Sequence, residues 1–194
     1  SPDESGGPRV RVFSGAGFGQ IDDFFGIDDT NFRGGARVAV GDVNGDGVGD
    51  LIVAAGFGGG PRVAGFSGKT LGGAGRARVF GDFFAFEDSL RNGAFVAVGD
   101  VNGDGHADLI GGGGPGGAPR VTIYSGADLT ASNVKTVLSN FFAGDIDNRG
   151  GVRVAARNLD GDQLADLVVG AGAAAGSRVT GYPGKTLTQS SPPA

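Results

Sequence analysis

The stretch VAVGDVNGDGVGDLIVAAG at residues 38–56 places an acidic, glycine-rich loop between two apolar runs. Its heptapeptide GDVNGDG, residues 41–47, returns unchanged at residues 99–105, a shift of 58 positions. A third copy, NLDGDQ at residues 158–163, follows after another 58 positions. A fixed period of this length indicates one supersecondary unit per repeat, because isolated turn motifs would not keep a constant spacing.

Residues far from the acidic loop keep the same period. The recurring sets are Arg33, Arg91 and Arg149; Arg62, Arg120 and Arg178; and Leu71, Leu129 and Leu187. The segment GPRVRVFSG at residues 7–15 matches GPRVAGFSG at residues 60–68, which predicts a partial unit before the three full ones. We expect the repeat array to span residues 8–187, between an N-terminal linker (1–7) and a Ser/Pro-rich tail (188–194).

Each unit contains four strand-like segments. In the first unit, residues 36–40 and 62–66 alternate, residues 51–55 form a short apolar run, and residues 76–84 are longer and less regular. Four short strands per 58 residues, joined by glycine-rich turns, are typical of a β-propeller blade. The sequence therefore predicts an all-β fold of about three four-stranded blades plus an N-terminal partial one, with a β-solenoid as the alternative.

Composition excludes several classes of function. The chain has no cysteine and one histidine, which excludes disulfides, cysteine-zinc sites and most Ser-His or Cys-His catalytic machinery. The net charge of −5 argues against nucleic-acid binding. No apolar run approaches the roughly 18 residues of a membrane-spanning helix, and no signal peptide is present in this sequence. We therefore expect a protein that is not an enzyme, does not bind nucleic acid and does not insert into a membrane.

The acidic loops at 42–50, 100–108 and 158–166 have the residue types of calcium sites. Oxygen-bearing side chains occupy loop positions 1, 3, 5 and 9, and such side chains at alternate positions of a tight turn can converge on one ion. Hard oxygen donors without nitrogen or sulfur favour calcium over zinc or copper, and magnesium would demand a stricter octahedron. With the backbone carbonyl at position 7, the predicted ligands are Asp42, Asn44, Asp46, Val48 and Asp50; Asp100, Asn102, Asp104, His106 and Asp108; and Asn158, Asp160, Asp162, Leu164 and Asp166.

About three calcium ions are therefore expected, one per loop. Glycine at positions 4 and 6 supplies the positive φ that the turn needs, but Gln163 stands at position 6 of the third loop. A non-glycine residue held there costs about 1 kcal/mol, so we expect the third site to be the weakest. The alternative, that these residues only form turns, is disfavoured because three carboxylates in each loop would repel one another without a cation.

The loops with their flanks, VAVGD before and DL after, followed by GGGPRV or GGAPRV, resemble the FG-GAP repeats of integrin α-subunit propellers and the related VCBS repeats of bacterial surface proteins. The resemblance implies a propeller in which each loop joins two neighbouring strands of a blade and holds calcium. The Phe-Gly half of the motif is replaced by Gly34-Gly35, Asn92-Gly93 and Gly150-Gly151. Such propellers usually close with about six to eight blades. This array is therefore expected to be incomplete, or completed by a homo-oligomer or by further blades of a parent chain.

Other recurring residues have expected structural roles. Interblade packing is predicted for Phe13, Phe66, Tyr124 and Tyr182, and for Phe25, Phe83 and Phe141. Hydrogen bonds between neighbouring strands are predicted for Arg9, Arg62, Arg120 and Arg178. The ring of His106 is expected to face solvent, and the acids Asp22, Asp23, Asp28 and Asp29 are expected to form a solvated turn.

These features together predict a non-enzymatic calcium-binding module of an extracellular or cell-surface protein. Its expected role is adhesion, scaffolding or ligand display, with a protein or a glycan as partner. Extracellular modules bind calcium with Kd values of about 10⁻⁴ to 10⁻³ M, which suits millimolar calcium outside the cell. A carbohydrate-binding (lectin-like) propeller is the alternative, and an accessory domain of a secreted enzyme is a further one.

Overall fold

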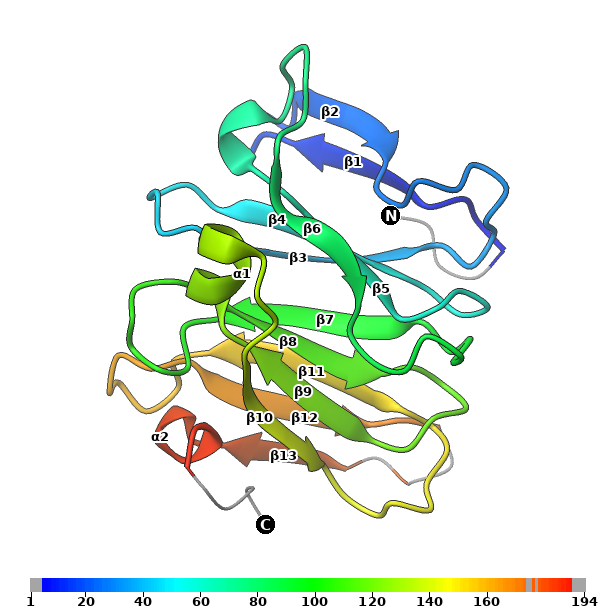
Figure 1. Cartoon of the computed structure of the whole chain (residues 1–194), viewed down its shortest axis with the longest axis vertical. Helices are drawn as coiled ribbons and strands as arrows, with labels where there is room; N and C mark the ends of the chain where they lie inside the picture. The colour runs from blue at the N-terminus through cyan, green and yellow to red at the C-terminus, as the bar shows by residue number, and fades with distance from the viewer. Residues whose placement is uncertain (1–4, 174–175, 177, 190–194) are drawn as a thin grey trace.

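A computed structural model describes residues 5–173, 176 and 178–189, and these fold into four antiparallel sheets (Figure 1). We call them the partial blade and blades 1, 2 and 3. The partial blade is β1 (Arg9–Phe13) and β2 (Gln20–Phe25); blade 1 is β3 (Ala36–Gly41), β4 (Asp50–Ala55), β5 (Arg62–Phe66) and β6 (Arg78–Phe84); blade 2 is β7 (Ala94–Gly99), β8 (Asp108–Gly113), β9 (Arg120–Tyr124) and β10 (Val137–Phe142); blade 3 is β11 (Val152–Arg157), β12 (Asp166–Ala171) and β13 (Val179–Tyr182). Short helical segments follow the third strands: η1 (Gly68–Thr70), α1 (Gly126–Ser132) and α2 (Gly184–Leu187).

The predicted fold class is confirmed. Strands that are consecutive in sequence are neighbours in each sheet, so every blade is an antiparallel meander. The innermost strands β3, β7 and β11 lie side by side and bring the blades together (Figure 1). The described residues form no closed ring of blades, in agreement with an incomplete propeller. In the described part of the chain, no helix is long and apolar enough to cross a membrane.

Buried apolar clusters between successive blades form the core. Every residue of β4 and β8 is buried, because each of these strands lies at the middle of the stack and is covered on both faces. This double coverage explains why, after the aspartate that begins each strand, their sequences carry no further polar side chain instead of alternating. One cluster joins Ile52 and Val63 of blade 1 to Leu109 of blade 2, and the next joins blade 2 to Leu167 of blade 3.

Edge-to-face aromatic pairs link the outer parts of neighbouring blades. The ring centroids are 4.9 Å apart for Phe24 and Phe66, 5.3 Å for Phe83 and Tyr124, and 5.2 Å for Phe141 and Tyr182. The prediction of interblade packing is thereby confirmed for Phe66, Phe83, Tyr124, Phe141 and Tyr182.

The same prediction was wrong for Phe25 and Phe13. Side chains alternate along β2, so Phe24 faces blade 1 and Phe25, 46 % exposed, faces the other way. Phe13 is 51 % exposed because no described blade covers that side of β1.

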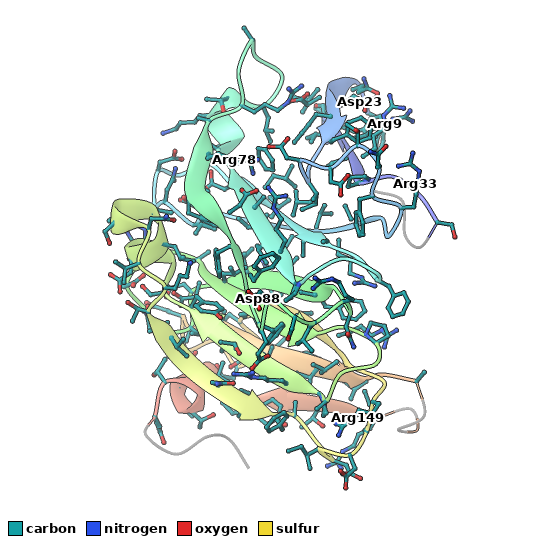
Figure 2. The ribbon with its side chains drawn as sticks, turned by 45° about the vertical axis from the view of Figure 1, so that its right-hand side comes forward. Arg9, Asp23, Arg33, Arg78, Asp88 and Arg149 are labelled. Carbon is teal, nitrogen blue, oxygen red and sulfur yellow. The ribbon has the colours of Figure 1, made fainter. Side chains whose placement is uncertain are left out.

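Three of the four recurring arginines tie the last two strands of a blade together, as predicted. The fourth, Arg178, precedes β13, the last strand of blade 3 among the described residues, so the prediction is not confirmed there. Arg9 on β1 pairs with Asp23 on β2, and Figure 2 shows the two side chains next to each other. Arg62 Nε donates to Asp82 Oδ2 at 3.1 Å in blade 1. In blade 2, Arg120 Nε donates to Asn140 Oδ1 at 2.9 Å. The chain thus repeats one strand-to-strand contact in three units.

Asp22 connects the partial blade to blade 1, which corrects the expectation that it belongs to a solvated turn. Its buried carboxylate accepts hydrogen bonds from Gly72 N and Arg76 Nε, both at 2.9 Å, in the loop between β5 and β6. The Arg76 guanidinium also lies 4.5 Å from the centroid of the Phe24 ring. The hydrogen bonds from Arg76 hold the pKa of Asp22 down at about 2, despite the burial.

Candidate metal centre

The three acidic loops occupy the same place in their blades. The ladder between the first two strands ends at the pairs Gly41 with Asp50, Gly99 with Asp108, and Arg157 with Asp166. Each nine-residue loop therefore joins the innermost strand of a blade to the second strand, at one end of the array. The predicted ligand residues of all three loops therefore lie at this end of the array.

Both predicted glycine positions have positive φ. At position 6 the φ values are 84° for Gly47, 84° for Gly105 and 76° for Gln163, so the glutamine adopts the conformation expected of a glycine. The third loop therefore carries the backbone strain that its sequence indicates.

The side chain at position 1 organises the loop from inside. Asp42 accepts hydrogen bonds from Asp46 N at 2.9 Å and Gly47 N at 2.7 Å. Asp100 accepts them from Gly103 N at 2.6 Å and Gly105 N at 2.9 Å. These bonds fold the loop back onto its first residue.

Positions 3 and 5 interact with each other. The amide Nδ2 of Asn44 donates to Asp46 Oδ2 at 3.0 Å, and Asn102 makes the same bond to Asp104. In the third loop an aspartate, Asp160, takes position 3, so this amide donor is missing there.

The aspartate at position 9 has a structural role that the sequence interpretation missed. Its two carboxylate oxygens accept backbone N–H groups from different segments: the start of its own loop, and the turn or helix after the third strand. The distances for these two contacts are 3.1 and 3.0 Å at Asp50 (from Val43 and Gly68), 2.9 and 3.0 Å at Asp108 (from Val101 and Gly126), and 2.7 and 2.8 Å at Asp166 (from Leu159 and Gly184). Position 9 therefore joins the loop to a segment 18 residues further along the chain.

A recurring glycine was the sequence signal for this contact. A Cβ atom on Gly68, Gly126 or Gly184 would lie only 2.1, 2.2 or 2.7 Å from the carbonyl oxygen of loop position 8. Only glycine lets the backbone approach closely enough for its N–H to reach the buried aspartate.

The electrostatics of position 9 differ between loops. Burial raises the pKa of Asp108 to about 6, and the nearby carboxylates of Asp104 and Asp100 add to the increase. Burial also raises the pKa of Asp50. At Asp166 the hydrogen bonds from Gly184 and Leu159 outweigh the effect of burial, and its pKa is lowered. A cation beside Asp108 would compensate a charge that is costly to hold in the fold.

The third loop gathers its carboxylates most closely. Asp160, Asp162 and Asp166 each place one oxygen within 4.8 Å of the others, and among the described residues this is the one group of three acids so close together. Calcium–oxygen bonds are about 2.3 to 2.6 Å long, so oxygens sharing one ion lie up to about 5 Å apart. This cluster could hold a metal ion. The close approach of the three carboxylates favours calcium binding by the third loop, whereas the positive φ of Gln163 disfavours it. The order of calcium affinity among the three loops therefore stays a prediction.

Neighbouring loops interlock from blade to blade. Ala107 N donates to the carbonyl of Asp42 at 2.8 Å, and Ala165 N donates to that of Asp100 at 2.7 Å. His106 Nδ1 lies 3.1 Å from the carbonyl oxygen of Val43, and its ring covers Gly45. The expectation that the His106 ring faces solvent was therefore wrong, because the ring packs on the loop of the preceding blade.

The family model of the FG-GAP repeat matches residues 34–80 and 92–124. Blades 1 and 2 are FG-GAP repeats. Each matched segment begins just before the innermost strand and runs through the acidic loop to the third or fourth strand. FG-GAP repeats occur in extracellular, integrin-like β-propeller proteins and often bind calcium. The third loop lies outside the matched segments, although its backbone conformation and hydrogen bonds follow those of the first two FG-GAP loops. No curated protein matches the chain.

Proposed function

We propose that the chain is a calcium-binding β-propeller module of an extracellular or cell-surface protein, without catalytic activity. Its role would be adhesion, scaffolding or the display of a ligand-binding surface. The observation that carries the proposal is the recurrence of one loop frame in three blades, with oxygen-bearing side chains at the same four positions each time.

The proposed ligands are the side chains at positions 1, 3, 5 and 9 and the backbone carbonyl at position 7. Each carboxylate oxygen of Asp166 already accepts one backbone N–H, but an oxygen with two lone pairs can still coordinate an ion. One divalent cation per loop would neutralise most of the loop's negative charge. It would also connect the hairpin loop to the segment that position 9 holds.

Because neighbouring loops interlock, an ion in one loop would also stiffen the junction to the next blade. The contact from Ala107 to Asp42 and the packing of His106 on Gly45 join the first loop to the second. We therefore propose that calcium stabilises the stacking of blades as well as the loops. With Kd values of about 10⁻⁴ to 10⁻³ M the sites would fill outside the cell and stay empty in the cytosol.

The proposed absence of catalysis rests on the residues available. The single histidine is engaged with the Val43 carbonyl and Gly45, so it is not placed as a general base in an open cleft. The repeat array is proposed to occupy residues 8–187 between a linker (1–7) and a tail (188–194). Residues 1–4 and 190–194 lie outside the described part of the chain.

Thermal unfolding in EDTA, calcium and magnesium tests the proposal. Calcium at ten times its Kd should stabilise the folded chain by about 1.4 kcal/mol per site, and magnesium should have a smaller effect. Asp162→Asn should reduce the calcium effect, because Asp162 belongs to the acidic cluster. Asp147→Asn, an exposed acid outside the loops, should leave it unchanged. Identical melting in EDTA and in millimolar calcium would overturn the proposal.

A carbohydrate-binding role is the second candidate, favoured by one cleft. It has a volume of about 300 Å³ and lies at the end of blade 1 opposite its acidic loop. Its walls combine the rings of Phe32 and Phe84 with the guanidinium groups of Arg62 and Arg91, a mixture that suits a sugar ring and its hydroxyls. If the chain binds glycans on an array and Phe84→Ala abolishes that binding, this role would be supported. An array on which the chain binds no glycan would eliminate it.

A further inference from the structure

The first and second acidic loops share one heptapeptide, but the helical segments beside them differ in sequence. Gly68 at the start of η1 and Gly126 at the start of α1 each donate a backbone N–H to the aspartate at position 9, in both blades at 3.0 Å. This contact fixes the beginning of each segment against its loop. The next residue is Lys69 in blade 1 and Ala127 in blade 2. A lysine is therefore placed next to one loop and an alanine next to the other.

The ammonium group of Lys69 contacts the first loop directly. Its Nζ lies 3.2 Å from Asp46 Oδ2 and donates to the backbone carbonyl of Asp46, also at 3.2 Å. Asp46 stands at position 5, so its carboxylate is one of the proposed calcium ligands. The same Oδ2 accepts Asn44 Nδ2 at 3.0 Å, and Oδ1 accepts Val48 N at 2.9 Å. A positive charge of the protein itself thus lies against a proposed ligand of the first loop.

The second loop has the same local hydrogen bonds without the ammonium group. Asp104 stands at position 5 there, and its Oδ1 accepts His106 N at 2.9 Å while its Oδ2 accepts Asn102 Nδ2 at 3.0 Å. The methyl group of Ala127 offers neither a charge nor a donor in place of Lys69. The two loops therefore differ by one positive charge beside position 5.

We infer that Lys69 competes with calcium for Asp46 and thereby makes the first loop a weaker calcium site than the second. The inference rests on the proposed calcium binding. In the empty loop the ammonium group compensates part of the carboxylate charge. When calcium binds, Lys69 has to give up Asp46 or stay close to a doubly charged ion, and both cost free energy.

Solvent limits the size of this effect. The side chain of Lys69 is 53 % exposed and that of Asp46 is 22 % exposed, so water and salt screen the charges. We expect Lys69 to raise the Kd of the first loop by about three- to tenfold.

A lysine also follows the glycine of blade 3. Lys185 is the second residue of α2, and Gly184 before it donates to Asp166 Oδ1 at 2.8 Å. The hydrogen bonds from Gly184 and Leu159 lower the pKa of Asp166, and the charge of Lys185 adds to this effect. The same competition therefore acts on the third loop, and Ala127 leaves the second loop free of it.

Calorimetric calcium titration of chains with a single intact loop tests the inference. Asp104→Asn combined with Asp162→Asn leaves the first loop, and Asp46→Asn combined with Asp162→Asn leaves the second. In the first-loop chain Lys69→Gln should lower the Kd by about three- to tenfold, whereas Lys69→Arg, which keeps the charge, should change it by less than about twofold. In the second-loop chain Ala127→Lys should raise the Kd.

Thermal melting of the chain with all three loops intact gives an independent readout. In EDTA, Lys69→Gln should lower the Tm by about 1 to 4 °C, because the first loop loses its counter-charge. In saturating calcium this difference should vanish or reverse. Lys135→Gln is the matched control, because Lys135 lies over the Phe83 ring and not on a loop, and its effect should be the same in both conditions.

The outcomes separate this inference from the proposed function. If the first-loop chain binds calcium and Lys69→Gln leaves its Kd unchanged or raises it, the inference is overturned and the proposed calcium binding stands. If neither chain with a single intact loop binds calcium at millimolar concentration, the proposed function fails and the inference fails with it.

Discussion

Replacing Asp166 by asparagine should destabilise the protein even when no calcium is present. The buried carboxylate of Asp166 accepts Leu159 N at 2.7 Å through one oxygen and Gly184 N at 2.8 Å through the other. An asparagine of the same size keeps one acceptor oxygen and turns an NH₂ group toward the other backbone N–H. The matched control is Asp162→Asn, because Asp162 belongs to the same acidic cluster but is exposed and accepts only the local Leu164 N at 3.0 Å.

The expected size follows from the hydrogen bond that asparagine cannot accept. A hydrogen bond to a charged group contributes about 1.5 to 3 kcal/mol, and a buried N–H left without an acceptor costs about 1 to 3 kcal/mol. Because the two effects overlap, we expect the free energy of unfolding to fall by about 2 to 4 kcal/mol. For a protein of this size, where 1 kcal/mol shifts Tm by about 2 to 4 °C, that corresponds to a decrease in Tm of about 4 to 16 °C. Asp162→Asn should change the stability by less than about 0.5 kcal/mol in EDTA.

Differential scanning calorimetry in EDTA and in calcium measures both effects. In EDTA only Asp166→Asn should melt early, whereas in calcium both variants should lose part of the stabilisation that the unchanged chain gains. If Asp166→Asn and the unchanged chain have the same Tm in EDTA, the two backbone hydrogen bonds contribute nothing to the stability of the fold, and the reasoning fails. Equal decreases in Tm for Asp166→Asn and Asp162→Asn in EDTA would also refute it.

Three further substitutions test other parts of the structure. Gln163→Gly should raise the free energy of unfolding by about 1 kcal/mol, because the residue has a φ of 76°, while Gln163→Ala should bring no such gain in the same chemical denaturation series. Phe83→Ala should lower the free energy of unfolding by about 3 to 5 kcal/mol, because Phe83 is buried against the next blade, whereas Phe84→Ala, 47 % exposed, should cost about 1 kcal/mol or less. Asp22→Asn should destabilise the chain at pH 6, and the difference from the unchanged chain should shrink as the pH falls from about 4 to about 2, because the pKa of Asp22 is about 2 in the fold against about 3.9 when unfolded. A difference for Asp22→Asn that stays constant across this pH range, in urea titrations, would show that the ion pair with Arg76 contributes no stability.

The repeat made most of the fold predictable from sequence. The 58-residue period and the short apolar runs indicated four strands per blade, and the match between residues 7–15 and 60–68 indicated the partial blade. The oxygen-bearing positions and the positive φ of the loops were also predictable, because they depend on local residue types. Even the strain at Gln163 could be read from its register against two glycines.

Contacts between distant segments were not predictable in the same way. The hydrogen bond from Gly184 N to Asp166 joins residues 18 positions apart and depends on the pairing of β12 with β13. The ion pair between Asp22 and Arg76 joins residues in different blades. A cluster of acids in the local sequence does not show whether one of them is buried in such a pair or all of them lie in a solvated turn. At Phe24 and Phe25 two identical side chains are adjacent, and only the orientation of β2 against blade 1 decides which one is buried. Tertiary packing determines these contacts, and they cannot be predicted from the repeat period alone.

The number of calcium ions bound per chain tests the central claim most directly. Native mass spectrometry or equilibrium dialysis at saturating calcium should find about three ions per chain, and the Asp46→Asn, Asp104→Asn and Asp162→Asn variants should each lose one. A chain that binds no calcium at millimolar concentration, or that keeps all its ions when these loop residues are changed, would contradict the account.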